Sequence, residues 1–573
     1  MRQLTPVEIE AVGRLGTTAD DWSKIRVAED FRPEQLRQSR LCGRVELGSG
    51  AVIIGSAVAD YRIGPRTRIE GCTAVVCRHC STFGNGVPVA TINENGGRTL
   101  RICEATSAQT AYLAALWRHR PQLVATLDTF AARIAEERAD TLGTIGADCR
   151  ITGARFIREV RIGDRVTIDG ASLLENGTLC NDVQIGIDVK ATDFIAAEGA
   201  RIAGGTTLER CFVGESCILD KNFTATDSLF FANAHCENGE AAAIFAGPYT
   251  VSHHKASLLI AGLFSFFNAG SASNQSNHLF KSGAVHQAVH LRGCKFASGA
   301  YIMAPAVEGP FTMVMGHHVH HHDTTEFPYS YLLEKEGRSQ LLPALNLTSY
   351  GTVRDIEKWP ARDRRTVRRD AIRFEEHNPY LTGLMIRAVN VLHQLQEERP
   401  EAESYPYKGV IIRSSALQRG IKLYNRAIVA ALGAMLGRGS ADTACDGSGH
   451  WIDLAGLYMP KAEAERIAGS IERGELQSLA AIDEAFRRFA DRYDDYARSW
   501  AVQAYAALLG HTPSEEELRE AVEAGANARA AMRRTTDADL GRDNAPEMAV
   551  GYGIDCDTEE ERQRDFCSVR GLA

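Results

Sequence analysis

Single aliphatic residues, separated by Gly and small polar residues, recur with a six-residue rhythm in the first half of the chain. The spacings along the clearest stretch are six, six, five, six, six, five and six, at Ile145, Ile151, Ile157, Ile162, Ile168, Leu174, Leu179 and Ile185. The rhythm also appears at Ile54, Ile63, Ile69, Ile202, Leu208, Val213 and Leu219. Three such steps make a coil of about 17 to 18 residues, which indicates a solenoid of stacked repeats.

A six-residue step has a direct physical interpretation. Each coil would contain three short strands, and one aliphatic side chain on each strand would point inward and stack on the next coil. Gly and other small residues would occupy the corners, where the backbone needs positive φ or close approach. A β-sandwich with Gly-rich turns is the alternative, but its strands would alternate with a period of two. We therefore predict a left-handed parallel β-helix over residues 41–345, less regular after about residue 249.

The remaining segments have helical patterns. Thr5, Pro6 and Glu8 form a capping box that predicts a helix within an N-terminal segment of residues 1–40. Amphipathic periodicity predicts a helical insertion at about 104–140, divided by Pro121. An Arg-rich connector follows at 346–380, and an α-helical C-terminal domain at 381–573. We expect its helices at about 381–395, 416–436, 461–469, 480–509 and 515–534, with an extended tail at 548–573.

Composition narrows the class of protein. The 573 residues carry a net charge of −9, which argues against nucleic-acid binding. The most apolar stretch, residues 258–267, is too short for a membrane span, and the first residues lack the apolar core of a signal peptide. The 14 Cys include one CxxC, Cys77 and Cys80, without the second pair that a zinc site needs. We expect a cytoplasmic protein with free thiols.

Candidate chemistry gathers in the irregular coils. Eleven of the 17 His lie between His235 and His322. Amide, imidazole and ammonium groups suited to sugar hydroxyls and phosphate occur close together at Asn268, Asn274, Gln275, Asn277, His278, Lys281, His286 and Gln287, after His253 and His254. A ladder of stacked Asn would explain one amide per coil but not this density. We assign His278, His286 and Lys281 to catalysis and the others to substrate binding.

A second cluster is the run from His317 to Asp323. Alternate residues of a strand share a face, so His318, His320 and His322 would project together, with His317 opposite. Three imidazoles suit Zn²⁺ or another divalent metal, the one cofactor that the sequence suggests. The alternative is a single general base from this run, for which we name His317, because an imidazole titrates near neutral pH.

The third cluster is the Arg-rich connector. Arg354, Lys358, Arg364 and Arg365 could bind phosphate, since a guanidinium offers a planar pair of donors. The same residues could equally form a charged linker stabilised by the Asp and Glu residues among them.

Several segments resemble a known family. These segments are residues 234–240 (AHCENGE), 245–255 (FAGPYTVSHHK) and 274–278 (NQSNH), and residues 565–571 (DFCSVRG) near the end. They resemble a bacterial family described as a domain of unknown function, with hexapeptide-like repeats and a second helical domain. The resemblance covers most of the chain and implies a β-helix, but it implies no activity.

More distantly, the coils are similar to the hexapeptide acyltransferase superfamily and to the β-helix of sugar nucleotidyltransferases. That similarity implies a homotrimer with active sites between adjacent β-helices and an imidazole base. The chain departs from the superfamily in its helical insertion, its large C-terminal domain and its lack of an alignable coenzyme A site.

Three hypotheses follow. The first is a transferase that acts on a phosphorylated sugar or a nucleotide sugar, with a His base and with phosphate bound by Lys281 and by Arg354 or Arg364. The second is a metal-dependent hydrolase, lyase or isomerase that uses the His-rich run. The third is a non-catalytic scaffold or regulatory protein, in which the polar cluster serves packing. None of the three involves nucleic acid or a membrane.

Overall fold

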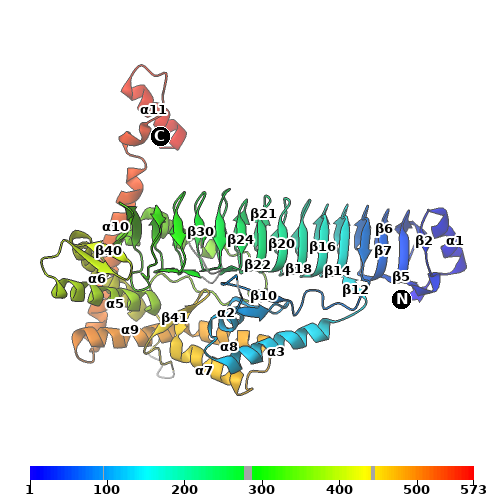
Figure 1. Cartoon of the computed structure of the whole chain (residues 1–573), viewed down its shortest axis with the longest axis horizontal. Coiled ribbons are helices and arrows are strands. Elements are labelled where there is room, and N and C mark those ends of the chain that lie inside the picture. Colours follow the sequence, from blue (N-terminus) through cyan, green and yellow to red (C-terminus); the bar gives the residue numbers. More distant parts are fainter. Residues whose placement is uncertain (95, 277–286, 441–444, 573) are drawn as a thin grey trace.

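A row of stacked parallel strands runs through most of the molecule (Figure 1). The computed structural model describes residues 1–94, 96–276, 287–440 and 445–572. In the regular part, longer strands bend across two faces of each coil: β5 (Arg40–Leu47), β7 (Ala57–Ile63), β14 (Phe156–Ile162), β16 (Leu173–Leu179), β18 (Lys190–Ala196), β20 (Thr207–Val213) and β22 (Thr224–Phe230). The predicted parallel β-solenoid is confirmed, and its left-handed winding stays a prediction.

Short strands form the third face and the later coils. The third face contains β6 (Val52–Ile54), β8 (Arg68–Glu70), β13 (Arg150–Thr152), β15 (Thr167–Asp169), β17 (Gln184–Ile185), β19 (Arg201–Ile202), β21 (Ile218–Asp220), β23 (His235–Glu237), β26 (Val251–Ser252), β29 (Asn268–Ala269), β32 (Lys295–Phe296), β35 (Met313–Met315) and β37 (Tyr331–Lys335). The other two faces of the later coils contain β24 (Glu240–Ala242), β25 (Phe245–Ala246), β27 (Leu258–Ile260), β28 (Gly262–Phe264), β30 (Asn274–Ser276), β31 (Ala288–His290), β33 (Tyr301–Met303), β34 (Ala306–Glu308) and β36 (His317–His318).

Neighbouring coils are in register at a step of 17 residues. Ile157 lies beside Leu174, which lies beside Ala191, and all three are fully buried. At the bend of each long strand, a residue with positive φ turns the chain: Glu159, Asn176, Asp193, Arg210 and Asp227. Their side chains also join coils, as in the 2.6 Å hydrogen bond from Asn176 Nδ2 to Asp193 Oδ1. Non-Gly residues adopt this strained conformation because each corner is held by the coils on both sides.

The first coil begins before residue 41. Helix α1 (Pro6–Arg14) carries the predicted capping box, in which the side chains of Thr5 and Glu8 bond each other's backbone. Strands β2 (Thr18–Ala19) and β3 (Ile25–Val27) already pair with β5. The N-terminal segment is therefore a helical cap together with part of the solenoid.

The helical insertion is longer than predicted. The chain leaves the solenoid after β9 (Ala74–Val76) and returns at β12 (Gly143–Ile145), which pairs with β7. We call residues 77–142 the insertion. It contains the hairpin β10 (Pro88–Ala90) and β11 (Thr99–Arg101), followed by α2 (Ala108–Leu116) and α3 (Pro121–Arg138). Both helices lie along the flank of the solenoid (Figure 1).

Helices and hairpins follow the last coils. Beyond β37 come β38 (Arg338–Leu342), β39 (Ser404–Tyr407), β40 (Val410–Arg413), β41 (Trp451–Leu454) and β42 (Leu457–Pro460). The helices are α4 (Tyr350–Lys358), α5 (Pro379–Glu398), α6 (Ser414–Leu436), α7 (Lys461–Glu472), α8 (Leu479–Asp491), α9 (Tyr493–Leu509), α10 (Glu515–Arg542) and α11 (Glu559–Arg570). No helix in these described ranges is both long and apolar enough to cross a membrane.

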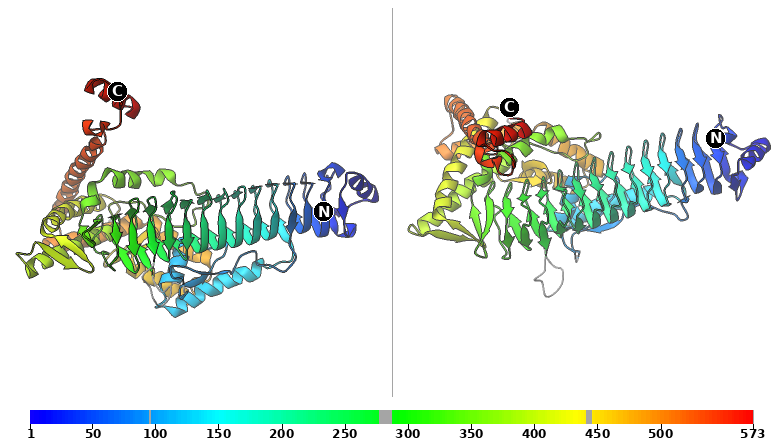
Figure 2. Two further views of the ribbon diagram at one scale, coloured as in Figure 1. Left: turned by 45° about the horizontal axis from the view of Figure 1, so that its top comes forward. Right: turned by 90° about the horizontal axis from the view of Figure 1, so that it is seen from above.

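Two predictions for the C-terminal part are wrong. The single helix expected at 480–509 is two helices, α8 and α9, because the chain turns at Arg492. The tail expected to be extended contains α11, whose capping box at Thr558 and Glu561 is a local signal that hydrophobic periodicity does not reveal. Helix α10 packs against α6, and α11 lies beyond its end, away from the rest of the molecule (Figure 2).

The insertion, the connector and α8 meet in a buried polar contact. Ser107 Oγ donates a 2.6 Å hydrogen bond to Asp483, and Asp370 accepts one of 2.7 Å from the backbone of Ala108. Burial raises the pKa of Asp483 to about 7, and the charge of Asp370 contributes to the rise. The folded state therefore favours the protonated Asp483 carboxyl, although the hydrogen bond from Ser107 opposes the rise in pKa.

The raised pKa of Asp483 predicts that stability falls as pH rises. The unfolded chain releases this proton near pH 4 and the folded chain near pH 7, so the contribution is complete below pH 4 and lost by about pH 7, at up to about 1.4 kcal/mol per pH unit. We expect the difference in melting temperature between Asp483→Asn and the unmodified protein to grow in favour of the variant from pH 5 to pH 7.5. Parallel profiles in differential scanning fluorimetry would contradict this interpretation.

The inward columns predict a large cost for a single truncation. Ile168 is fully buried between Ile151 and Ile185, whereas Ile187 is 60% exposed. We expect Ile168→Ala to lower the free energy of unfolding by about 2–5 kcal/mol because it leaves a cavity. The matched control, Ile187→Ala, should change it by less than about 0.5 kcal/mol in urea denaturation followed by circular dichroism. Equal effects would contradict the stacking register.

Candidate functional site

The inward columns of the solenoid change from apolar to polar in the last coils. One column passes through Val213, Phe230, Ala246 and Phe264, and then contains His290 and Glu308. A second passes through Ala225, Ala241 and Leu259, and then contains Gln275, Ile302 and His318. Polar and charged side chains thus occupy positions that apolar residues fill in the earlier coils of these columns.

Three of these side chains, Gln275, His290 and Glu308, form a hydrogen-bonded chain with His322, which follows β36. We call these four residues the interior polar cluster. His290 Nε2 lies 3.1 Å from Gln275 Oε1, and its Nδ1 bonds one Glu308 oxygen. The other Glu308 oxygen lies 2.7 Å from His322 Nε2. The side chains of His290, Glu308 and His322 are completely buried.

The electrostatics of the cluster favour an ionised carboxylate. Burial alone would raise the pKa of Glu308, but the charges and hydrogen bonds of His290 and His322 lower it well below its usual range. Burial likewise opposes charge on His322, but the bond to Glu308 raises the pKa of this imidazole. The cluster is therefore a buried charge with specific partners, an arrangement that is costly to keep and often marks a functional region.

A cavity of about 330 Å³ lies against His322. It is lined by Gln287, His321, Asp323 and Lys408 together with apolar residues of β31 and β34. Its wall therefore combines Gln287 with residues of the run from His317 to Asp323. The structure places Gln275, Gln287 and His322, three of the predicted site residues, in or beside the interior polar cluster.

The His-rich run does not present three imidazoles on one face. Strand β36 contains only His317 and His318, and the chain turns after it, so the alternation of a longer strand is lost. The rings of His318 and His322 are buried 6.0 Å apart, whereas His320 is exposed. His318 bonds Ser339 Oγ at 2.8 Å instead of a metal partner. Within the described ranges, no group of three or more His, Cys, Asp or Glu is arranged to hold a metal ion.

The cluster predicts opposite effects of partial and complete replacement. Glu308→Ala leaves two buried imidazoles without their partner, so we expect it to lower the free energy of unfolding by about 3–5 kcal/mol. Gln275→Leu/His290→Phe/Glu308→Leu/His322→Phe continues the apolar columns, so it should be neutral or stabilising. Urea denaturation compares the two. If the fourfold variant is less stable than Glu308→Ala, the cluster stabilises the fold, and its position gives no support to a functional role.

A second site lies on the outside of the solenoid, where the connector crosses the third face. Asn233 holds the connector in place, since its Nδ2 donates to Asp363 Oδ1 at 3.1 Å and its Oδ1 accepts from the Arg364 backbone at 3.2 Å. The cavity beside this contact has a volume of about 350 Å³. We call it the arginine–histidine pocket, and its charged and aromatic lining consists of His235, Tyr249, His253, Trp359, Arg362 and Arg364.

The two arginines that line this pocket are exposed and unpaired. Among the residues that the structure describes, neither Arg362 nor Arg364 makes a side-chain hydrogen bond or ion pair. Arg365, in the same connector, differs: its guanidinium is buried and bonds both Asp363 oxygens, at 2.9 and 2.8 Å. Burial would raise the pKa of Asp363, but this pairing lowers it to about 2. Arg365 therefore holds the connector and does not face a ligand.

A carboxylate orients the imidazole of His235. Its Nε2 lies 2.9 Å from Glu237 Oε1, and Glu237 also accepts from Lys221 Nζ at 2.6 Å. This leaves Nδ1 of His235 without a described partner. The ring of His253 lies 4.1 Å away, and partial burial together with the charge of His235 lowers the pKa of His253. A carboxylate-oriented imidazole can accept a proton, and a neutral one beside it can donate a hydrogen bond.

Aromatic side chains form the inner wall of the pocket. Trp359 packs edge-on against Phe266 with ring centroids 4.6 Å apart, and Tyr249 stacks on Phe266 at 5.1 Å. Tyr249 is buried, and its hydroxyl has no hydrogen-bond partner among the described residues. The wall thus offers apolar ring surface and one unsatisfied hydroxyl beside two free guanidinium groups.

The other predicted site residues lie outside the interior polar cluster. His253 and Arg364 line the arginine–histidine pocket. Asn268 lies in the next coil, beside Val251 of this pocket. His254, His317 and Lys358 are exposed and lie outside the pocket. Arg354 pairs with Asp355 at 3.1 Å, and Asn274 lies in β30 with a buried oxygen that lacks a described partner. The predictions for Asn277, His278, Lys281 and His286 lie outside the described residues.

Sequence reasoning missed His235, Glu237, Arg362 and Trp359 as residues of one site. A signal was present, since His235 and His253 are 18 residues apart, about one coil, and so lie on the same face. Nothing in the sequence indicated that the connector crosses this face. The crossing depends on Asn233, a corner residue with positive φ whose amide is free to bind another segment.

A long parallel β-solenoid with a helical insertion and helices after its last coils defines the class of protein. Within this class, the family model described as "Domain of unknown function (DUF4954)" matches residues 51–396, and "Domain of unknown function (DUF6819)" matches residues 438–573. The first match covers more than half of the chain, so the protein belongs to the DUF4954 family. It is also similar to an "Uncharacterized protein" of Treponema pallidum (strain Nichols), with 22% identity over 88% of this chain and 82% of the relative.

Proposed function

We propose that this protein is a transferase that acts on a phosphorylated sugar or a nucleotide sugar bound in the arginine–histidine pocket. One observation carries the proposal: a cavity of about 350 Å³ is lined by a carboxylate-oriented imidazole and by two guanidinium groups that have no carboxylate partner in the described part of the chain. Cavities of about 300–1,000 Å³ are typical of small-molecule sites.

Each group has a role in this proposal. Arg362 and Arg364 would bind the phosphate, because a guanidinium forms paired, charge-assisted hydrogen bonds to its oxygens. Trp359 and Tyr249 would pack against the ring of the sugar or base. His235 would take the proton from the attacking hydroxyl or amine of the acceptor through Nδ1, while Glu237 stabilises the imidazolium that forms. The acceptor oxygen or nitrogen would bond the anomeric carbon of the sugar as the bond from that carbon to the phosphate oxygen breaks. Phosphate or a nucleoside diphosphate would leave, with its charge held by Arg362 and Arg364.

The distant similarity to the hexapeptide acyltransferase superfamily supports group transfer by an imidazole base, as an argument from analogy. From the same similarity we propose a homotrimer, and from the composition a cytoplasmic location. The metal-dependent alternative lacks support, because His320 is exposed whereas the rings of His318 and His322 are buried. The scaffold alternative is separated from the proposal by the binding experiment below.

The proposal predicts selective stabilisation by phosphorylated sugars. In a thermal-shift assay, we expect UDP-glucose or glucose 1-phosphate to raise the melting temperature of the full chain, and glucose to leave it unchanged. The double variant Arg362→Gln/Arg364→Gln should weaken binding at least tenfold in calorimetry. His235→Gln should bind normally but transfer no sugar to an acceptor.

Arg354→Gln is the matched control, because Arg354 lies on the same connector but pairs with Asp355. It should bind each ligand as the unmodified protein does. Binding without a specific response to the double variant would refute the pocket assignment. The absence of any response to phosphorylated sugars would refute the proposed substrate class and favour the scaffold hypothesis.

A further inference from the structure

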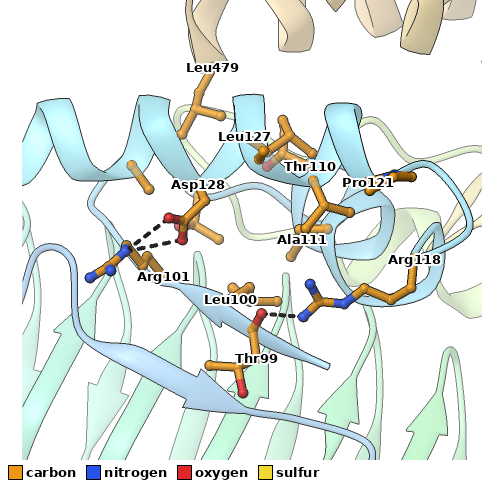
Figure 3. Close-up of a pocket in the computed structure, with 15 residues that line it drawn as sticks. Thr99, Leu100, Arg101, Thr110, Ala111, Arg118, Pro121, Leu127, Asp128 and Leu479 are labelled. Atoms are coloured by element: carbon orange, nitrogen blue, oxygen red, sulfur yellow. Dashed lines mark hydrogen bonds and ion pairs between the residues drawn. The ribbon is translucent and has the colours of Figure 1, made fainter. Parts of the chain in front are cut away.

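A separate cavity of about 360 Å³ lies within the insertion. Its walls come from β11, α2 and α3, and from Leu479 at the start of α8 (Figure 3). The cavity thus spans the insertion and the C-terminal helices. None of the residues that line it belongs to the arginine–histidine pocket or to the interior polar cluster.

The walls of this insertion pocket are largely apolar. The side chains facing it include those of Leu100, Ala111, Ala114, Val124, Leu127 and Leu479. Small alanines of α2 leave the space open, since Ala111 and Ala114 stand where larger residues would fill it. Such a surface favours an apolar ligand, because burying it from water is stabilising at about 25 cal/mol per Å².

Two arginines mark opposite sides of the cavity (Figure 3). Arg101 is neutralised by Asp128, with Nε 3.1 Å from a carboxylate oxygen. Arg118 has no carboxylate bonded to it among the described residues. Its Nη2 donates to the backbone oxygen of Thr99, and its Nε is buried without a hydrogen-bond partner. Among the described residues, Arg118 is therefore a cation of this cavity without a carboxylate partner, and its Nε–H can still donate a hydrogen bond.

A second arginine, Arg98, adds positive charge near Arg118. Among the described residues, Arg98 bonds neutral groups alone: the Gln287 side chain and the Ala115 backbone oxygen, both at 3.0 Å. Burial lowers the pKa of Arg98 and of Arg118, and the charge of Arg98 lowers that of Arg118 further. Two partly buried like charges repel each other, and a bound anion would relieve this repulsion.

We propose that the insertion pocket binds an amphipathic anion with a medium-length alkyl chain. The chain lies among Leu100, Leu127 and Leu479, and the anionic head bonds Arg118 near Arg98. A fatty-acid carboxylate and an alkyl phosphate share this chemistry. Because Leu479 belongs to α8, the ligand contacts both the insertion and the C-terminal helices, so its binding stabilises their contact.

The test is calorimetric titration of the full chain with octanoate, octyl phosphate and the uncharged octanol. We expect one of the two anions to bind at least tenfold more tightly than octanol and to raise the melting temperature. The stronger of the two anions identifies the head group. Arg118→Gln should weaken anion binding at least tenfold and leave octanol binding unchanged.

Two further variants keep the experiment decisive. Ala114→Phe fills the cavity and should abolish binding, and circular dichroism checks that it remains folded. Arg150→Gln removes an exposed arginine of the solenoid and should change nothing. Equal affinity for octanol and both anions, normal binding by Arg118→Gln, or no binding at millimolar ligand would each overturn the proposal. None of these results bears on sugar phosphates at Arg362 and Arg364.

Discussion

The in-register stacking of coils is the constraint on which the rest of the molecule depends. Each coil places its inward side chains directly over those of the preceding coil, so a column accepts only residues that tolerate burial beside their counterparts. Ile157, Leu174 and Ala191 satisfy it by hydrophobic contact. His290 and Glu308 satisfy it in the same column geometry by hydrogen bonds. The interior polar cluster therefore continues the stacked columns of the repeat, with hydrogen bonds in place of hydrophobic contacts.

The same geometry places the outer site. Because coils are stacked in register, His235 lies beside Val251 on an external face, and His253, two residues further along the chain, places its ring 4.1 Å from that of His235. Corner residues with positive φ project side chains from the edges of the solenoid, and Asn233 uses its amide to hold the connector. The connector then places Arg362 and Arg364 beside the imidazoles. The regular coils thus position the two imidazoles, and the connector, which lies outside the repeat, provides the two positively charged guanidinium groups.

Much of the solenoid could be predicted because its period lies in the aliphatic positions themselves, from Ile145 to Ile185. The helix cap at Thr5 is an equally local signal. The site could be predicted only in part. His253 and Arg364 are candidates by residue type, but their meeting depends on a contact between distant segments. The expectation for His320 failed because strand β36 ends after His318, and strand length depends on tertiary packing that the alternation of residues does not contain.

If the arginine–histidine pocket binds the phosphate of a sugar ligand, a crystal structure of the full chain grown with UDP-glucose will show the ligand there. We expect phosphate oxygens within hydrogen-bond distance of the guanidinium groups of Arg362 and Arg364, and the sugar or base ring against Trp359. Density for the ligand at another place on the molecule, with this pocket empty, would contradict this expectation.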